Sequence, residues 1–121
     1  MKNILVIDDE EIIREMIQTI LEDEGYNVYL ASDGSEGLKQ CRSISDISLA
    51  ITDIVMPEKE GLETIHELRK IVPDLKIMAV SGVGNKDTYL RMAKTLGADF
   101  ILPKPFSAEE LVASVEEVIS D

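Results

Sequence analysis

Short aliphatic runs alternate along the chain with longer segments in which apolar residues recur at helical spacing. The aliphatic runs predict five β-strands, at about residues 3–8, 27–31, 48–52, 76–80 and 99–102. The first, third and fourth runs contain almost no polar residues, which is typical of strands covered on both faces. This alternation predicts an α/β fold with a parallel sheet, right-handed crossovers and helices on both sides.

Helical periodicity is strongest between Asp9 and Glu24, where apolar residues form two adjacent ridges and Gly25 supplies a stop. Near the end of the chain, Ser107 and Glu110 match a capping box ahead of another apolar stripe. Weaker stripes predict three further helices, at about residues 35–42, 62–72 and 85–96. Each predicted strand is therefore followed by a helix.

Length and composition narrow the number of domains and the kinds of binding partner. A chain of 121 residues with 45% hydrophobic residues suits a single globular domain with an ordinary core. Its formal net charge of −12 argues against direct binding of this domain to nucleic acid or to an anionic membrane. The charge leaves open a DNA-binding partner or a further domain.

Other features predict an ordinary soluble protein. Cys41 has no second cysteine with which to pair, and its helical spacing from Leu38 and Ile44 predicts a buried structural thiol. His66, among charged residues of a predicted helix, is expected at the surface. The sequence contains no apolar run of membrane-spanning length and no evident signal peptide, so we expect a cytoplasmic location.

Polar residues stand where the predicted strands end. Asp8 and Asp9 follow the first run, Asp53 the third, Ser81 the fourth and Lys104 the fifth. Because parallel strands open their carboxyl ends on one edge of the sheet, these side chains are expected to converge there. Three carboxylates favour an oxygen-liganded metal, and Mg²⁺ suits the set better than Ca²⁺ or zinc. The combination could hold a hard cation and a phosphoryl group.

Each of these residues also has an ordinary structural explanation. Adjacent acids stabilise a helix N-terminus, a strand-end aspartate initiates turns, and lysine or serine is common in surface turns. Their expected convergence is what favours a functional site. Lys104 also lies between two prolines, and the pattern Lys-Pro-Phe predicts a cis peptide bond between Lys104 and Pro105.

Taken together, the motifs resemble the receiver domain of two-component response regulators. The motifs are Asp8-Asp9, Asp53-x-x-Met56-Pro57-x-x-x-Gly61, Ser81-Gly82, Gly97-Ala98-Asp99 and Lys104-Pro105-Phe106. The resemblance covers the whole chain, so residues 1–121 are expected to form one receiver domain. It implies a flavodoxin-like, doubly wound (βα)5 fold with a five-stranded parallel sheet in the order 2-1-3-4-5.

The resemblance also implies roles for the strand-end residues. Asp53 would be the phosphoacceptor, taking a phosphoryl group from a phosphohistidine. Asp9, Asp53 and the main-chain carbonyl of Val55 would bind Mg²⁺ directly, and Asp8 would act mostly through a bound water. Lys104 would pair with Asp53 and then with the phosphoryl oxygens.

A switch and a set of partners are implied in the same way. Ser81 would turn toward the phosphoryl group and bias the fourth helix and fifth strand toward an active arrangement. The phosphodonor would be a sensor histidine kinase or a phosphotransfer protein. A downstream protein or output domain would bind the face made by the fourth helix, fifth strand and fifth helix, and phosphorylation could produce a homodimer there. The chain would act alone or as the N-terminal part of a larger regulator.

One departure from the family concerns the switch. The family usually has Tyr or Phe three residues before the lysine, where this chain has Ile101. The nearby aromatic residue is Phe100, and a shift of one residue in a strand reverses the side-chain face. Phe100 therefore cannot simply replace the usual aromatic.

A second departure predicts a long-lived phosphoryl group. Val55 and Val83 lie two residues after Asp53 and Ser81, and an aliphatic side chain cannot orient a hydrolytic water. We expect slower loss of the phosphoryl group than in relatives with polar or acidic residues there. Similar lifetimes for the wild type and Val83→Glu would contradict this expectation.

Two other kinds of protein would share part of this pattern. A Mg²⁺-dependent phosphohydrolase or phosphotransferase with an aspartyl nucleophile usually needs a second acid two residues later, where this chain has Val55. A pseudo-receiver that serves only as a binding surface would have lost an acid, the hydroxyl or the lysine, and none is lost. A phosphorylated signalling module remains the leading interpretation.

Overall fold

The computed structural model describes residues 2–53, 60–81, 91, 94–95 and 97–120. Within these residues, five parallel strands form a single sheet in the order β2-β1-β3-β4-β5. The strands are β1 (Asn3–Ile7), β2 (Asn27–Ala31), β3 (Ile47–Asp53), β4 (Lys76–Ser81) and β5 (Phe100–Pro103). The predicted parallel sheet and its strand order are confirmed.

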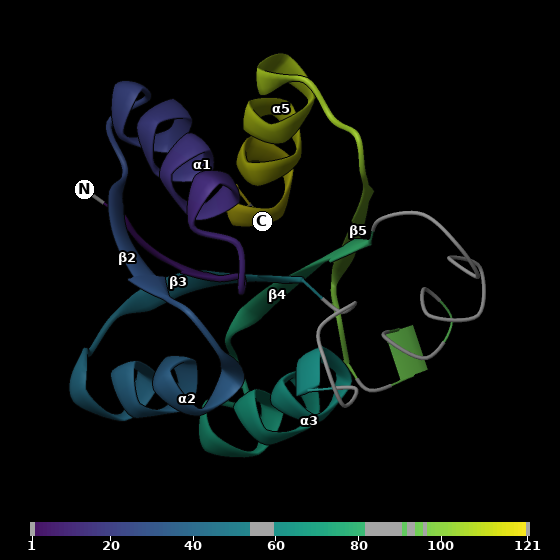
Figure 1. Ribbon diagram of the computed structural model, residues 1–121. Coiled ribbons are helices and arrows are strands. Elements are labelled where there is room, and N and C mark those ends of the chain that lie inside the picture. Colours follow the sequence, from purple (N-terminus) through teal and green to yellow (C-terminus); the bar gives the residue numbers. More distant parts are fainter. Residues whose placement is uncertain (1, 54–59, 82–90, 92–93, 96, 121) are drawn as a thin grey trace.

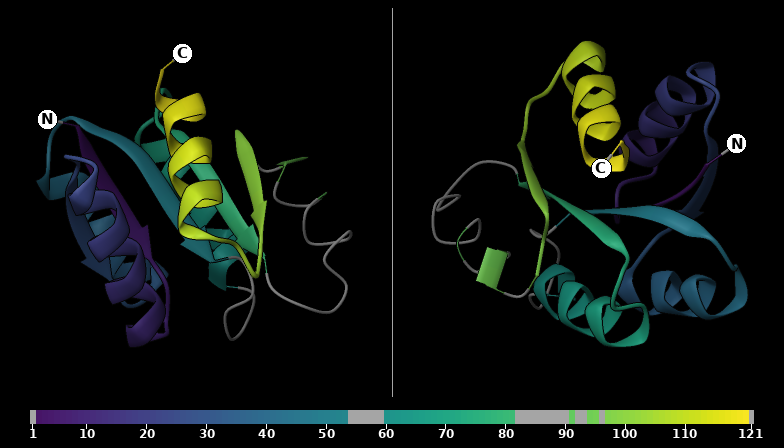
Figure 2. Two further views of the ribbon diagram at one scale, coloured as in Figure 1. Left: turned by 90° about the horizontal axis from the view of Figure 1, so that it is seen from above. Right: turned by 180° about the vertical axis from the view of Figure 1, so that it is seen from behind.

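Helices cover both faces of this sheet (Figure 1). They are α1 (Glu11–Asp23), α2 (Gly34–Ser43), α3 (Glu60–Ile71) and α5 (Ala108–Ile119). Helices α1 and α5 lie side by side on one face, and α2 and α3 lie on the other (Figures 1 and 2). Most of the predicted helix at 85–96 lies outside the described residues, although Arg91, Lys94 and Thr95 are helical.

The strand side chains divide between two cores, one on each face. Ile4 and Val6 of β1 face the core beneath α1 and α5, whereas Leu5 and Ile7 face the core beneath α2 and α3. All four side chains are fully buried. This two-sided burial explains why the strand sequences lack polar alternation.

The helix ends follow local signals in the sequence. Helix α1 ends just before Gly25, whose φ of 94° is a left-handed conformation that suits glycine. The predicted capping box of α5 is present, because Ser107 Oγ accepts the Glu110 N–H and the Glu110 carboxylate accepts the Ser107 N–H. Helix α2 begins at a similar cap, where the Asp33 carboxylate accepts the Glu36 N–H at 2.8 Å.

Four of the five strands, all but β2, differ from their predicted bounds by one residue at one end or at both ends. Strand β3 extends to Asp53, which pairs with Val80 of β4. Strand β5 begins at Phe100 rather than at residue 99. Just before β5, the Asp99 N–H donates to the Ile77 carbonyl at 2.7 Å, and the Asp99 carboxylate accepts the Ile77 N–H at 2.8 Å.

Several single-residue predictions can also be checked. Cys41 is buried, and burial raises the pKa of its thiol, as suits a structural cysteine. His66 is exposed. Phe100 packs against the α1/α5 core and Ile101 against the α2/α3 core, which confirms that they lie on opposite faces of β5. No helix in the described part of the chain is long and apolar enough to cross a membrane.

Candidate functional site

The register of the sheet brings two aspartates together at its carboxyl edge. Ile7 of β1 lies opposite Thr52 of β3, so the next residues along the two strands, Asp8 and Asp53, are neighbours. Asp8 is 2% exposed and Asp53 is 5% exposed. Two buried carboxylates at one edge require compensating positive charge or hydrogen bonds.

Lys104 supplies positive charge to both aspartates. Strand β5 ends at Pro103 beside Ser81 of β4, and Lys104 follows it directly. Its Nζ lies 3.1 Å from Asp53 Oδ2 and 3.6 Å from Asp8 Oδ2. The peptide bond between Lys104 and Pro105 is cis, as predicted. The expected pairing of Lys104 with Asp53 is therefore present, and Asp8 shares the same ammonium.

The chain around Asp8 is held by two contacts that the sequence analysis did not identify. The Asp8 carboxylate accepts the Glu10 N–H at 2.8 Å, and Arg14 Nη1 donates to the Asp8 main-chain carbonyl at 2.7 Å. Arg14 lies in the first turn of α1, so a helix folding back over the end of β1 is needed to make its contact. No sequence motif marked either residue.

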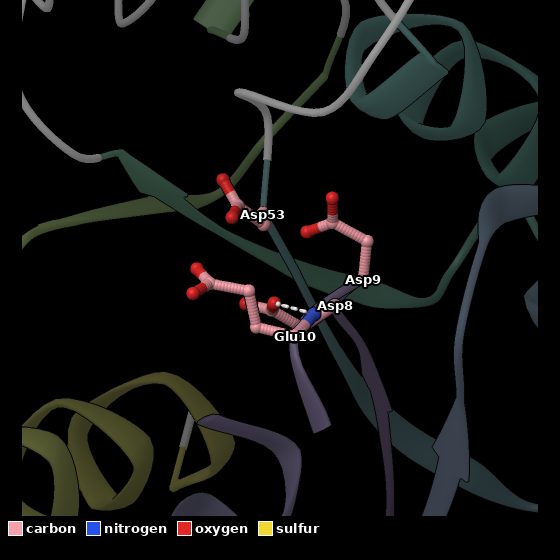
Figure 3. Close-up of side chains that lie close together, drawn as sticks. All are labelled: Asp8, Asp9, Glu10 and Asp53. Carbon is pink, nitrogen blue, oxygen red and sulfur yellow. Dashed lines mark hydrogen bonds between the residues drawn. The ribbon is translucent and has the colours of Figure 1, made fainter. Parts of the chain in front are cut away.

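Four carboxylates converge at this edge (Figure 3). One carboxylate oxygen from each of Asp8, Asp9, Glu10 and Asp53 lies within 4.8 Å of the others. Glu10 is an addition to the set of carboxylates predicted from the sequence. Clustered carboxylate oxygens without Cys or His are the donors that hard cations prefer, so these residues fit Mg²⁺.

The environment shifts two pKa values in the site. Burial raises the pKa of Asp8, against the Glu10 N–H and the Lys104 charge, which lower it. Burial alone would lower the pKa of Lys104, but the charges of Asp53 and Asp8 outweigh that effect and raise it. Lys104 is therefore held in its charged form beside the aspartates.

The remaining predicted site residues are described only in part or not at all. Ser81 ends β4 at the same edge of the sheet, but its side chain is not among the described groups. Val55 and Val83 lie outside the described residues, as do Met56, Pro57 and Gly82. The structure thus brings together Asp8, Asp9, Asp53 and Lys104 from the predicted set.

This fold and this arrangement of acids and lysine agree with a family match. A sequence model of the response regulator receiver domain matches residues 4–116. The chain belongs to this family, whose members are signalling modules of two-component systems and are phosphorylated on an aspartate. The family match favours this function over the phosphohydrolase alternative.

Individual relatives support the assignment. The chain is 38% identical over 117 residues to response regulator RR06 of Streptococcus pneumoniae, covering 97% of this chain and 52% of that protein. It is 34% identical over 119 residues to a transcriptional regulatory protein CpxR homolog of Haemophilus influenzae, covering 98% and 51% of the two chains. The chain therefore spans about half the length of these two relatives.

A solved structure resembles the whole fold. The crystal structure of a response regulator receiver domain protein from Clostridium thermocellum superposes with a TM-score of 0.91 at 34% identity. The match covers 99% of this chain and 95% of that one. The likeness therefore extends over the complete sheet and its helices.

Proposed function

We propose that Asp53 is the phosphoacceptor of a phosphorelay and that residues 1–121 form one receiver domain. The observation that carries this proposal is the buried Asp53 carboxylate, 3.1 Å from the Lys104 ammonium and clustered with the carboxylates of Asp8 and Asp9. An aspartate is a weak nucleophile toward phosphorus unless nearby positive charge offsets the charge on the phosphoryl oxygens. Lys104 is placed to supply part of that charge.

The transfer forms one bond and breaks one bond. A carboxylate oxygen of Asp53 attacks the phosphorus of a phosphohistidine, the P–N bond breaks, and the imidazole leaves with its electron pair. Lys104 then exchanges its contact with Asp53 for one with the phosphoryl oxygens. Mg²⁺, bound by Asp9, Asp53 and the Val55 carbonyl with Asp8 acting through a water, would neutralise charge on those oxygens.

The same residues would let the domain catalyse two reactions of its own. It would accept a phosphoryl group from a small acyl phosphate, and later lose it to water. The acyl phosphate is also a ligand that favours one conformation over another. In this proposal Ser81 binds the phosphoryl group and biases β5 and the fourth helix, with Ile101 in place of the usual aromatic.

Partners follow from the family and from the charge of the chain. A sensor histidine kinase or phosphotransfer protein would donate the phosphoryl group. The face made by the fourth helix, β5 and α5 would bind a downstream protein, an output domain or a second copy. A net charge of −12 supports a domain that does not itself touch nucleic acid or membrane, and such relays operate in the cytoplasm. The chain would act alone or as the N-terminal part of a longer regulator.

Intact-mass measurement tests the proposal. The protein is incubated with acetyl phosphate and Mg²⁺, and wild type is compared with Asp53→Asn and with Asp74→Asn. The control removes an exposed aspartate that precedes β4, whereas the site lies at the carboxyl ends of the strands. We expect one phosphoryl adduct on wild type and Asp74→Asn, dependent on Mg²⁺, and none on Asp53→Asn. An adduct on Asp53→Asn, or none on wild type, would overturn the assignment.

A further inference from the structure

We propose that Glu10 sets the charge of the site, strengthening divalent-cation binding and repelling anionic phosphodonors. This role rests on the proposed function of Asp53 and extends it to a residue outside the predicted ligand set. In Figure 3 the Glu10 carboxylate lies among those of Asp8, Asp9 and Asp53. One oxygen of each lies within 4.8 Å of the others.

The Glu10 side chain is not engaged in capping its helix. Glu10 occupies the position before α1 with extended backbone angles, φ −99° and ψ 117°, and its side chain makes no capping hydrogen bond. Its N–H is instead donated to the Asp8 carboxylate at 2.8 Å, which fixes the backbone of Glu10 beside the site. The backbone contact holds Glu10 at the sheet edge, and the carboxylate remains exposed there.

Negative charge is in excess around this carboxylate. Among the described residues, four carboxylates gather here, whereas the Lys104 ammonium contacts only two of them, Asp53 and Asp8, and the Arg14 guanidinium contacts the Asp8 main chain. The negative charge of Glu10 also reaches Lys104, because it contributes to the raised pKa of that ammonium after the larger effects of burial, Asp53 and Asp8. Glu10 is thus coupled to both the acids and the lysine of the site.

Two consequences follow from Coulomb's law. A divalent cation in the carboxylate cluster is attracted by the Glu10 charge, so neutralising Glu10 weakens its binding. A dianionic donor such as acetyl phosphate is repelled by the same charge, so neutralising Glu10 speeds its reaction once the cation site is saturated. Glu10 is exposed, so solvent and salt screen both effects and keep them moderate.

Glu11→Gln provides a matched control for Glu10→Gln. Glu11 is the next residue, carries the same charge, lies exposed in the first turn of α1, and is absent from the carboxylate cluster. Titration calorimetry with Mg²⁺ alone gives the dissociation constant for each protein. Intact-mass time courses with acetyl phosphate at saturating Mg²⁺ give the rate of phosphorylation.

We expect Glu10→Gln to raise the Mg²⁺ dissociation constant about threefold to tenfold, and Glu11→Gln to change it less than about twofold. We expect the phosphorylation rate of Glu10→Gln at saturating Mg²⁺ to rise about twofold or more above that of Glu11→Gln. Loss of the Glu10 charge weakens Mg²⁺ binding but speeds phosphorylation. A damaged site would instead weaken Mg²⁺ binding and slow phosphorylation, so the two explanations are distinguished.

Equal Mg²⁺ affinity in the two variants would overturn the role of Glu10, as would a phosphorylation rate that stays level or falls. The wild-type protein distinguishes this failure from failure of the underlying function. If wild type binds Mg²⁺ and gains one phosphoryl group while the two variants behave alike, Asp53 keeps its role and Glu10 loses the one proposed here. If wild type gains no phosphoryl group, the proposed function itself fails.

Discussion

At the scale of single residues, Asp8 best shows how function opposes stability. Its side chain is almost completely buried, and its pKa is raised because burial disfavours the charged form. The Glu10 N–H and the Lys104 charge lower this pKa, and the carboxylates of Asp53 and Asp9 raise it further, so the net effect still disfavours the charged form. A cation-binding site assembled in this way is expected to destabilise the protein when no cation is bound.

Asp8→Asn should therefore stabilise the protein in Mg²⁺-free buffer. An asparagine oxygen can still accept the Glu10 N–H, while the buried charge is removed. We expect the Tm to rise by about 2–5 °C, since 1 kcal/mol shifts the Tm of a domain of this size by several degrees. Thermal unfolding with and without Mg²⁺ checks this, with Asp74→Asn as an exposed control. A lower Tm for Asp8→Asn in Mg²⁺-free buffer would contradict it.

The difference in stability between wild type and Asp8→Asn should depend on pH. A raised pKa means that folded Asp8 holds its proton more firmly than unfolded Asp8, whose ordinary value is 3.8. The wild-type penalty therefore grows as pH rises from 3.8 through the folded pKa, and it disappears when pH falls below 3.8. The advantage of Asp8→Asn should be largest near neutral pH and should shrink in acid.

At the scale of elements, helix α2 forms despite a glycine that weakens its sequence pattern. Gly37 is buried against β1, where the side chain of Ile7 is fully enclosed. A Cβ at position 37 would lie 2.5 Å from Cδ1 and 2.8 Å from Cγ1 of Ile7. The glycine therefore allows α2 to pack closely against the sheet. Helix propensity, which disfavours glycine, does not take this packing into account.

Gly37→Ala should destabilise the fold although alanine is the better helix former. Ile7 must move within a full core, which we expect to outweigh the helical gain and to lower the free energy of unfolding by about 1–2 kcal/mol. Urea denaturation measures the change, with the exposed Lys39→Ala of the same helix as a control.

A second substitution tests whether contact with Ile7 causes the loss of stability in Gly37→Ala. Ile7→Val removes the Cδ1 atom that lies nearest to the added Cβ. Combined with Gly37→Ala, it should lose less stability than the sum of the two single variants. Additive losses would mean that contact with Ile7 does not explain the glycine.

At the scale of the whole molecule, Arg69 connects segments that are far apart in the sequence. From helix α3, Nη1 donates to the carbonyls of Pro73 and Leu75 at 2.7 and 2.6 Å. Nη2 donates to the Gly97 carbonyl at 2.6 Å and to the Asp99 carboxylate at 2.9 Å. One guanidinium thereby ties α3 to the segments that lead into β4 and β5.

Arg69→Met should lower the free energy of unfolding by about 2–3 kcal/mol, because main-chain carbonyls and the Asp99 carboxylate lose their donor. Lys70→Met is the matched control, since Lys70 is 62% exposed and its contact with Glu67 is 3.8 Å long. We expect the control to change stability by less than about 0.5 kcal/mol. Equal losses in the two variants, measured by urea denaturation, would show that the Arg69 contacts add nothing.

The sequence by itself determined the elements, the α/β class and most of the site. Aliphatic runs and helical periodicity are local patterns, so they located the five strands and the described helices, with errors of one residue at the ends of β1, β3, β4 and β5. Motif resemblance supplied the strand order, which the structure confirms, and the roles proposed for Asp53 and Lys104. The predicted lifetime of the phosphoryl group stays a prediction, since Val55 and Val83 lie outside the described residues.

Only the tertiary structure decided which further side chains come into contact, at the site and elsewhere in the fold. Glu10 joins the carboxylates and Arg14 holds the Asp8 main chain because α1 turns back at the end of β1. The contact between Arg69 and Asp99 joins residues thirty positions apart. Such contacts depend on how helices pack on a twisted sheet, and that packing is a property of the whole chain that no local pattern records.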